Sequence, residues 1–405
     1  MAQRTLEPGK PAAPSIDWRQ FGTYVAYAIA IILLMAWLGP LAADKPPYRL
    51  VQSTITGLLV GGIYALVALG IVIINKASGV FNFAHGYMML TSALLFYSFF
   101  SNSTVNIVAA GIFAALTVMI VISMDSWRSL LNVRNMVIGA VAAAILTFLM
   151  TLRDPDLRLI RALVGGLVGA VFIGLVVERY AIRPLIGQPL FTAVLMTLAV
   201  GEVLHGLTLM IWGSVDIPLR IFAGVTQLGI PMPTIRIDAS ETFLDGRIII
   251  NSQLLIAFIL ALIAFAAFVA FFRYTNVGLA MRATAENQQL AQSVGMRVRF
   301  ILAVAWAIAA LLAMTAGVLQ GGATSLSQYM PLIALSAFPA VLLGGLESIG
   351  GALVGGLIIG LTQEWANLLF PGTQAGTEFA PYVVLMVVLI IRPDGLFGQK
   401  RIERI

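Results

Sequence analysis

Glu202 and His205 stand out among the ionisable residues of this chain, because both lie near the middle of the apolar run 190–212. Residues three apart share one face of a helix. An ionisable side chain in hydrocarbon costs about 2.5–3.5 kcal/mol on insertion scales, and such residues commonly mark the route of a solute, an ion or a proton. We expect this pair either to face a transport pathway or gate, or to form a hydrogen-bonded pair inside a helix bundle.

Asn82, Phe83, His85 and Gly86 form a second candidate site, in the motif VFNFAHG. Asn82 and His85 are also three residues apart. If a helix that begins here points its N-terminus into a cavity, its free N–H groups and its dipole would receive a carboxylate, as broken helices do in transporters. The alternative is a packing motif in which Asn82 caps a local break. The motif therefore predicts either substrate-pathway residues or a structural device.

The residue types speak against enzyme chemistry. The chain has no cysteine and two histidines, which excludes disulfides, thiol chemistry and a multi-histidine zinc site. No nucleophile or carboxylate pair stands at a usable spacing. A GxxxxGK[ST] phosphate loop is also missing, since Gly9 and Lys10 stand alone in a proline-rich segment. We expect no activity of an enzyme, no metal site and no cofactor bound by this chain.

The composition determines which elements position these residues. Of 405 residues, 60% are hydrophobic and 10% are charged, and the mean hydropathy is +0.97, which only a bilayer accommodates. A spanning helix needs about 20 apolar residues, and the runs lack the alternation of barrel strands. We expect an all-α polytopic membrane protein with about 10–12 transmembrane helices. The apolar runs lie near residues 21–39, 50–74, 78–100, 104–124, 134–151, 159–180, 190–212, 251–272, 299–320, 331–346, 347–370 and 379–392.

Two stretches predict broken or re-entrant segments. Residues 76–86 follow the preceding run almost without a turn, and residues 331–356 contain Pro339 and several glycines. Irregular backbone at membrane depth is tolerated only where protein buries it or where it lines a cavity. The glycine pairs of GxxxG spacing at 351–360 and 165–169 favour close helix packing over substrate contact.

Charge gives the orientation. About two-thirds of the 24 Lys and Arg residues fall on one side if the C-terminus is cytoplasmic, which favours both termini inside. The basic residues lie in short loops between the apolar runs, where orientation in the membrane explains the net charge of +6. No nucleic-acid partner is therefore expected. We expect a cytoplasmic tail over residues 1–20, a transmembrane domain over 21–405 and an outer loop over 213–250, a candidate docking surface.

Residues 273–298 form the most informative polar segment. Met281, Ala285, Leu290 and Val294 fall roughly at helical spacing, and Gly295 stands as a helix stop. We predict a short amphipathic helix on the cytoplasmic face; the alternative is a membrane-surface loop. Since Arg282 and Glu286 are four apart, they are expected to pair with each other or with a partner.

Several motifs, in their order along the chain, resemble those of the permease subunits of branched-chain amino acid ABC transporters, most of all the H type. The resemblance covers most of the chain from about residue 50 onward, and the excess length lies in the N-terminal segment and in residues 104–158. The motifs are SGVFNFAHGYMML (78–90), YAIRPLIGQPL (180–190), GLAMRATAEN (278–287) with Ala291 and Gly295, FPAVLLGGLESIGGALVGGLIIG (338–360) and IIRPDGLFG (390–398).

The resemblance implies a division of labour. ATP and magnesium would be bound by two cytoplasmic ATPase subunits. Their closure would move the helix bundle through residues 273–298, the cytoplasmic coupling segment. A second homologous permease, forming a heterodimer, and a periplasmic or extracytoplasmic solute-binding protein would complete the importer in the bacterial inner (plasma) membrane. Branched-chain amino acids are the family's default substrate, and urea or small amides are carried by relatives. The implied ATPase contacts are Arg282, Ala283, Glu286, Asn287, Ala291 and Gly295.

One other function fits the polar residues taken alone. In an ion-coupled secondary transporter or channel, Glu202, His205 and Asn82 would bind a proton or a coupling ion. Adjacent genes for an ATPase and a binding protein would favour the importer.

Overall fold

The computed structural model describes residues 39–102, 104–214, 216–219, 221, 235–242, 244–286, 288–372 and 378–398. The chain divides into two units, Met1–Pro46 and Pro47–Ile405. In the first unit residues 39–43 are helical. The expected tail over residues 1–20 and nearly all of the first apolar run lie outside the described residues.

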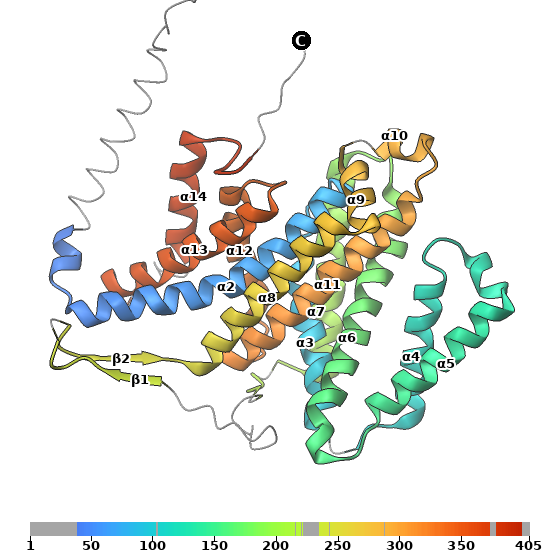
Figure 1. The fold of residues 1–405 in the computed structure, drawn as a ribbon, viewed down its shortest axis with the longest axis horizontal. Coiled ribbons are helices and arrows are strands. Elements are labelled where there is room, and N and C mark those ends of the chain that lie inside the picture. The colour runs from blue at the N-terminus through green and yellow to red at the C-terminus, as the bar shows by residue number, and fades with distance from the viewer. Residues whose placement is uncertain are drawn as a thin grey trace, which may run out of the picture. The chain divides into compact units, whose positions relative to one another are not determined.

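The second unit is built from helices (Figure 1). Each apolar run predicted from residue 50 onward coincides with one helix. Seven segments are long and apolar enough to cross a membrane, and three shorter apolar helices accompany them in the described part of the chain. These findings confirm an all-α polytopic membrane protein. The longer helices are α2 (Pro47–Ser78), α3 (His85–Ser101), α4 (Ile107–Ile122), α5 (Val133–Met150), α6 (Arg158–Val176), α7 (Leu190–Trp212), α8 (Ser252–Tyr274), α9 (Asn276–Glu286), α11 (Val298–Ala323), α12 (Met330–Gly344), α13 (Ile349–Leu369) and α14 (Ala380–Ile391).

The shorter elements connect these helices. They are helix α10 (Gln288–Ser293), the single turns Trp127–Leu131, Pro155–Leu157 and Arg183–Leu185, the π-helical turn Val177–Ile182, and the strands β1 (Ile235–Asp238) and β2 (Arg247–Ile250). The strands pair antiparallel, with Ile235 opposite Ile250. The side chain of Gln52 on α2 binds both N and O of Ile249, each at 2.7 Å, and so closes the outer edge of β2.

Helix α2 is the centre of the bundle. It is apolar all round and buried along most of its length, as expected of a helix enclosed by others. Glycines let α13 approach it closely: a Cβ on Gly356 would lie 2.4 Å from Ala65 N, and one on Gly360 would lie 2.4 Å from Gly57 O. The GxxxG prediction of helix packing is therefore confirmed.

Both predicted irregular segments are present. The chain leaves helical conformation from Gly79 to Ala84, between α2 and α3, and Asn82 and Ala84 are fully buried there. The second break is a tight turn between α12 and α13, where a Cβ on Gly344 would lie 2.2 Å from Gly351 O. Irregular backbone is thus found where protein buries it, as the membrane requires.

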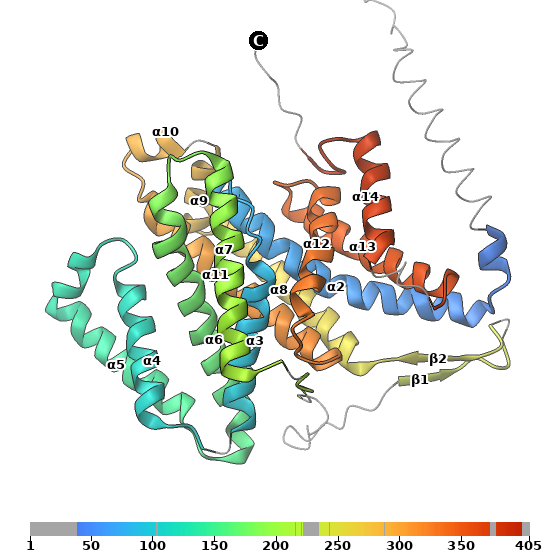
Figure 2. The same cartoon turned by 180° about the vertical axis from the view of Figure 1, so that it is seen from behind.

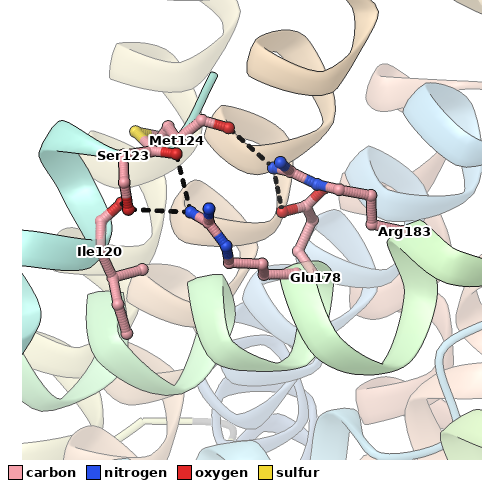
Figure 3. A network of polar contacts seen from close by, with 6 residues as sticks. Ile120, Ser123, Met124, Glu178 and Arg183 are labelled. Atoms are coloured by element: carbon pink, nitrogen blue, oxygen red, sulfur yellow. Dashed lines mark hydrogen bonds and ion pairs between the residues drawn. The ribbon is translucent and has the colours of Figure 1, made fainter. Parts of the chain in front are cut away.

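The hairpin of α4 and α5 stands beside α6 and is held to it at both ends (Figures 1 and 2). At one end the buried Arg161 donates to Phe99 O, Leu152 O and Asn102 O, with distances of 2.8, 2.9 and 2.5 Å. At the other end the π-helical turn and the residue after it bind the two residues that follow α4 (Figure 3): Arg179 donates to Ser123 O at 2.7 Å, and Arg183 to Met124 O at 2.9 Å.

Candidate functional site

The break between α2 and α3 is stabilised from within by Asn82. Its Oδ1 accepts a hydrogen bond from Ala84 N at 3.1 Å, and its Nδ2 lies 3.3 Å from Met88 Sδ. A side-chain amide that bonds backbone two residues on is a turn device. Asn82 therefore stabilises the break, which is the structural one of its two expected roles. Both polar atoms of its amide contact residues that follow closely in the chain.

Thr197 of α7 holds the break from outside. Its Oγ1 accepts a hydrogen bond from Phe83 N at 3.2 Å and lies within donating distance of Val194 O at 2.8 Å and Phe81 O at 3.2 Å. A Cβ added at Gly201, the midpoint of α7, would lie 3.6 Å from Ala84 Cα. The N-terminus of α3 therefore lies beside the middle of a long apolar helix, well inside the span.

His85 is the first residue of α3 and is fully buried. Both ring nitrogens lack a hydrogen-bond partner among the described residues. The ring packs on α2, since a Cβ on Gly70 would lie 2.5 Å from His85 Cε1. His85 thus points toward α2, whereas Gly86 contacts α12, where an added Cβ would lie 2.8 Å from Pro331 Cα.

Three aromatic rings cover the break on the side of α12. The ring centroids of Phe83 and Phe338 are 4.9 Å apart, and Phe81 lies 6.0 Å from Phe338 and 6.3 Å from Phe83. All three side chains are half-buried. Sequence reasoning named Phe83 and missed Phe338, whose only signal was its place beside Pro339.

Glu202 and His205 do contact each other, with 3.5 Å between Glu202 Oε2 and His205 Nδ1. The pair does not lie inside the bundle of this chain, because the Glu202 side chain is 74% exposed. His205 stacks on Tyr87 of α3, with ring centroids 5.0 Å apart. The pair on α7 therefore lies beside the first turn of α3, which follows the break. Tyr87 gave no signal in the sequence beyond its place after Gly86.

The polar segment 273–298, predicted to form one short amphipathic helix, contains two helices, α9 and α10. The corner from α8 into α9 is tight: a Cβ on Gly278 would lie 2.4 Å from Phe272 O, and Thr275 Oγ1 accepts from Gly278 N at 3.0 Å. Arg282 also donates to Phe272 O. Arg282 is therefore bonded to the end of α8, and no ion pair with Glu286 occurs among the described residues. Ala283 is half-buried and Glu286 is exposed.

Helix α9 packs against the last turn of α2. Met281 is 2% exposed, and it lines one small space together with Ile73, Ala77 and Phe268, where the two helices join α8. Lys76 Nζ lies 5.7 Å from the centre of the Phe272 ring and donates to Glu347 O at 3.0 Å. The end of α2 is thus fixed to the coupling segment just before the break begins.

Helix α10 ends as predicted at Gly295, which has a φ of +84°. Met296 N donates to Ala291 O and Gly295 N donates to Gln292 O, each at 3.0 Å, the two bonds of a Schellman motif. Ala291 is buried, whereas Leu290 and Val294 are 62% and 67% exposed. The apolar spacing noted in the sequence therefore belongs to two faces, one packed on the bundle and one open. Asn287 lies outside the described residues.

A cavity of about 910 Å³ opens between α9, the end of α2, the start of α7 and the turn before α13. Basic and acidic side chains line it together with Phe81, so that it reaches from the coupling segment to the aromatic cover of the break. Its charged lining consists of Lys76, Arg282, Glu286 and Glu347. No group of three or more potential metal ligands occurs in the described part of the chain.

Comparison with known sequences shows the family to which this chain belongs. Residues 133–391 match the family described as "Branched-chain amino acid transport system / permease component". The chain is similar to the "High-affinity branched-chain amino acid transport system permease protein LivH" of Escherichia coli K12, at 26% identity over 87% of this chain and 97% of that protein. BraD of Pseudomonas aeruginosa, which carries the same description, is 27% identical over 88% of this chain and 99% of its own.

A further relative is the "Probable branched-chain amino acid transport permease protein LivH" of Methanocaldococcus jannaschii, at 29% identity over 59% of this chain and 74% of that protein. No solved structure matches the chain.

Proposed function

Because the chain belongs to the family of branched-chain amino acid transport permease components, we propose that it carries leucine, isoleucine and valine, or small polar relatives such as urea and amides. It is a multi-pass membrane protein and the permease subunit of an ABC importer. The names of the relatives support the amino-acid substrate, and the solute-binding partner would set the choice among these solutes.

The assembly we propose places this chain beside a second homologous permease, as a heterodimer in the bacterial inner membrane. Two ATPase subunits would bind ATP and magnesium, and a solute-binding protein would deliver the substrate. The exposed Leu290 and Val294 on α10 support an ATPase contact, because exposed large apolar side chains on a polar segment commonly mark an interface.

One observation supports the mechanism most strongly: the coupling segment is fixed to the last turn of α2, and the break begins at the next residues. Force on α9 would reach α2 through Met281 and the Lys76–Phe272 contact. The chain from Gly79 to Ala84 has few backbone bonds of its own and depends on Asn82 and Thr197. A rigid-body shift of α9 would therefore alter the backbone conformation of the break before it distorts the helices.

The route we propose runs past the exposed Glu202. A carboxylate in the middle of an apolar span is stable only against water or a polar partner, and in this chain it is 74% exposed. We infer that this face of α7 borders the pathway shared with the second permease, with His205 and Tyr87 beside it. The cavity lined by Phe81 and by residues of α9 would then be the cytoplasmic vestibule of the route.

The combined variant Arg282→Glu and Gly295→Trp tests the coupling. The first change breaks the bond to Phe272 O, and the second places a large side chain at a positive-φ position with open space around it. We expect normal membrane insertion and loss of substrate-stimulated ATP hydrolysis in the assembled transporter.

A matched control is Arg153→Glu with Gly187→Trp. It makes the same chemical changes at an exposed arginine and at another positive-φ glycine with open space, both outside residues 273–298. Unchanged uptake in the Arg282 and Gly295 variant, or an equal loss in the control, would contradict the coupling role.

A further inference from the structure

Between the two ends of the α4–α5 hairpin, the helices leave a groove against α6. It encloses about 360 Å³, and its exposed lining is entirely apolar. Thr117 is the one hydroxyl residue along it, and its Oγ1 is already bonded to Phe113 O at 2.9 Å. The lining comes from all three helices and includes Val118, Ile138, Ala142, Leu146, Leu167 and Val171.

The groove cannot be closed by a simple shift of the hairpin. At one end Arg161 of α6 binds Leu152 O, just after α5, and two carbonyl oxygens at the end of α3. At the other end Arg179 and Arg183 bind the residues that follow α4 (Figure 3). Glu178, 1% exposed, fixes Arg183 by two bonds of 2.9 and 2.7 Å. Charge-assisted bonds of this kind are the stronger class of hydrogen bond. The space between the ends is therefore a fixed feature.

Something apolar has to fill this space. An empty apolar groove forfeits dispersion contacts along its walls, and water finds no polar partner there. The outer faces of the hairpin are exposed and apolar, with Ile112, Ile145 and Phe148 each more than half exposed. The groove is thus bordered by surface that suits hydrocarbon, and an acyl chain is the matching occupant.

Charge at one end of the groove selects the head group. Arg134 stands four residues before Ile138, on the same helical face, and Arg128 lies in the turn that joins α4 to α5. Neither guanidinium has a partner among the described residues, and both arginines are exposed. Two carboxylates on neighbouring elements already have partners: Asp125 pairs with Arg297 at 3.5 Å, and Glu178 pairs with Arg183.

Trp127 marks the depth of this end. The Arg179 guanidinium lies 3.9 Å from the centre of its ring, and tryptophan is enriched where a membrane meets water. The unpaired arginines would therefore stand at head-group level while the groove runs into the hydrocarbon.

We propose that α4, α5 and α6 form a binding site for one anionic phospholipid, with an acyl chain in the groove and the phosphate against Arg128 and Arg134. The site uses no residue of the coupling segment or of the proposed route, and it does not depend on the identity of the transported solute. Basic residues between membrane helices recognise lipid head groups by the same charge complementarity.

Native mass spectrometry of the full chain with added lipid tests the site. Phosphatidylglycerol and phosphatidylethanolamine with identical acyl chains are compared as single bound adducts. We expect phosphatidylglycerol to be retained at about tenfold lower lipid concentration, since each arginine near the surface favours an anionic lipid. The variant R128Q/R134Q should lose this preference, whereas R153Q, the same change at the other end of the hairpin, should keep it.

A second variant tests the groove itself. Ala142→Trp places an indole in the space of the acyl chain and should abolish retention of both lipids. Arg128 and Arg134 are exposed, and their guanidinium groups bond to nothing in the described part of the chain. R128Q/R134Q should therefore fold normally, so that arm decides the proposal even if Ala142→Trp does not fold. Equal retention of the two lipids by the unmodified chain, or an equal effect of R153Q, overturns the proposal. Loss of the adduct when the second permease assembles with the chain would make the groove a protein interface and would overturn it too.

Discussion

Lys76 at the end of α2 lies 5.7 Å from the centre of the Phe272 ring at the end of α8. Arg282 of α9 lies 5.3 Å from the same ring. One aromatic ring thus takes a cation from each of two helices, and contacts of this kind stabilise by about 0.5–2 kcal/mol. The coupling segment and the start of the break are joined at this point.

Met281→Ala should loosen the join between α9 and α2. Met281 is 2% exposed, and removing a buried methionine side chain costs about 2–5 kcal/mol in soluble cores. We expect a lower thermal midpoint for the purified chain and weaker coupling of ATP hydrolysis to uptake. Leu279→Ala on the same helix is the control: Leu279 is 57% exposed, so its midpoint should stay within error of the unmodified chain. Equal shifts in the two variants would mean that α9 is not anchored through Met281.

Thr197→Val should destabilise the break. The change keeps the shape of the side chain and removes the hydroxyl that accepts from Phe83 N, and an unpaired buried donor costs about 1–3 kcal/mol. Thr197→Ser retains the hydroxyl and should behave almost as the unmodified chain. Thermal midpoints in detergent and transport by the assembled importer are the two measurements. A valine variant as stable and active as the serine variant would show that α7 does not hold the break.

Hydrophobicity alone predicted most of the helices, because lipid leaves no other partner for the backbone. Gly295 could be read as a helix stop for a similarly local reason, since its left-handed conformation favours glycine. The break at 79–84 lies inside the stretch 76–86, which was predicted to be irregular because it follows the preceding apolar run almost without a turn. These features depend on a few neighbouring residues.

Other contacts left no trace in the sequence. Thr197 meets Phe83 across more than a hundred residues, and a threonine in an apolar helix is common. Met281, Leu290 and Val294 fit one helical face by spacing, yet the chain turns between α9 and α10 and sends Met281 inward and the other two outward. The exposure of Glu202 depends on packing across several helices, which spacing within one helix does not report.

Arg161→Met should release one end of the α4–α5 hairpin. Arg161 is 4% exposed and supplies three carbonyl oxygens with donors. Losing bonds to a charged donor and leaving buried acceptors costs about 3 kcal/mol or more. Arg161→Lys cannot reproduce the planar fork of donors, so its cleavage rate should lie between those of the unmodified chain and Arg161→Met. Limited proteolysis of the loops around residues 102 and 152 reports the release; Arg153→Met should leave the cleavage rate unchanged, and a faster rate there would contradict the assignment.

Glu202→Leu should lower uptake without harming insertion or stability. Glu202 is exposed in the middle of an apolar helix, so leucine is the better residue for insertion by about 3 kcal/mol. If Glu202 borders the route, transport by the assembled importer should fall about tenfold or more, and Glu202→Gln should retain part of it because it keeps a polar group. Val203→Ala, a change at the neighbouring residue, which is 62% exposed, is the control. Full uptake by the leucine variant would remove Glu202 from the route.

Radiolabelled leucine uptake into proteoliposomes tests the central claim most directly. The purified chain alone should accumulate no leucine under a proton or sodium gradient, because the coupling segment has no motor to move it. Reconstitution with its ATPase, permease and binding-protein partners should give uphill uptake that requires ATP. Sustained uphill accumulation by this chain unaided, driven by either ion gradient, would contradict the account.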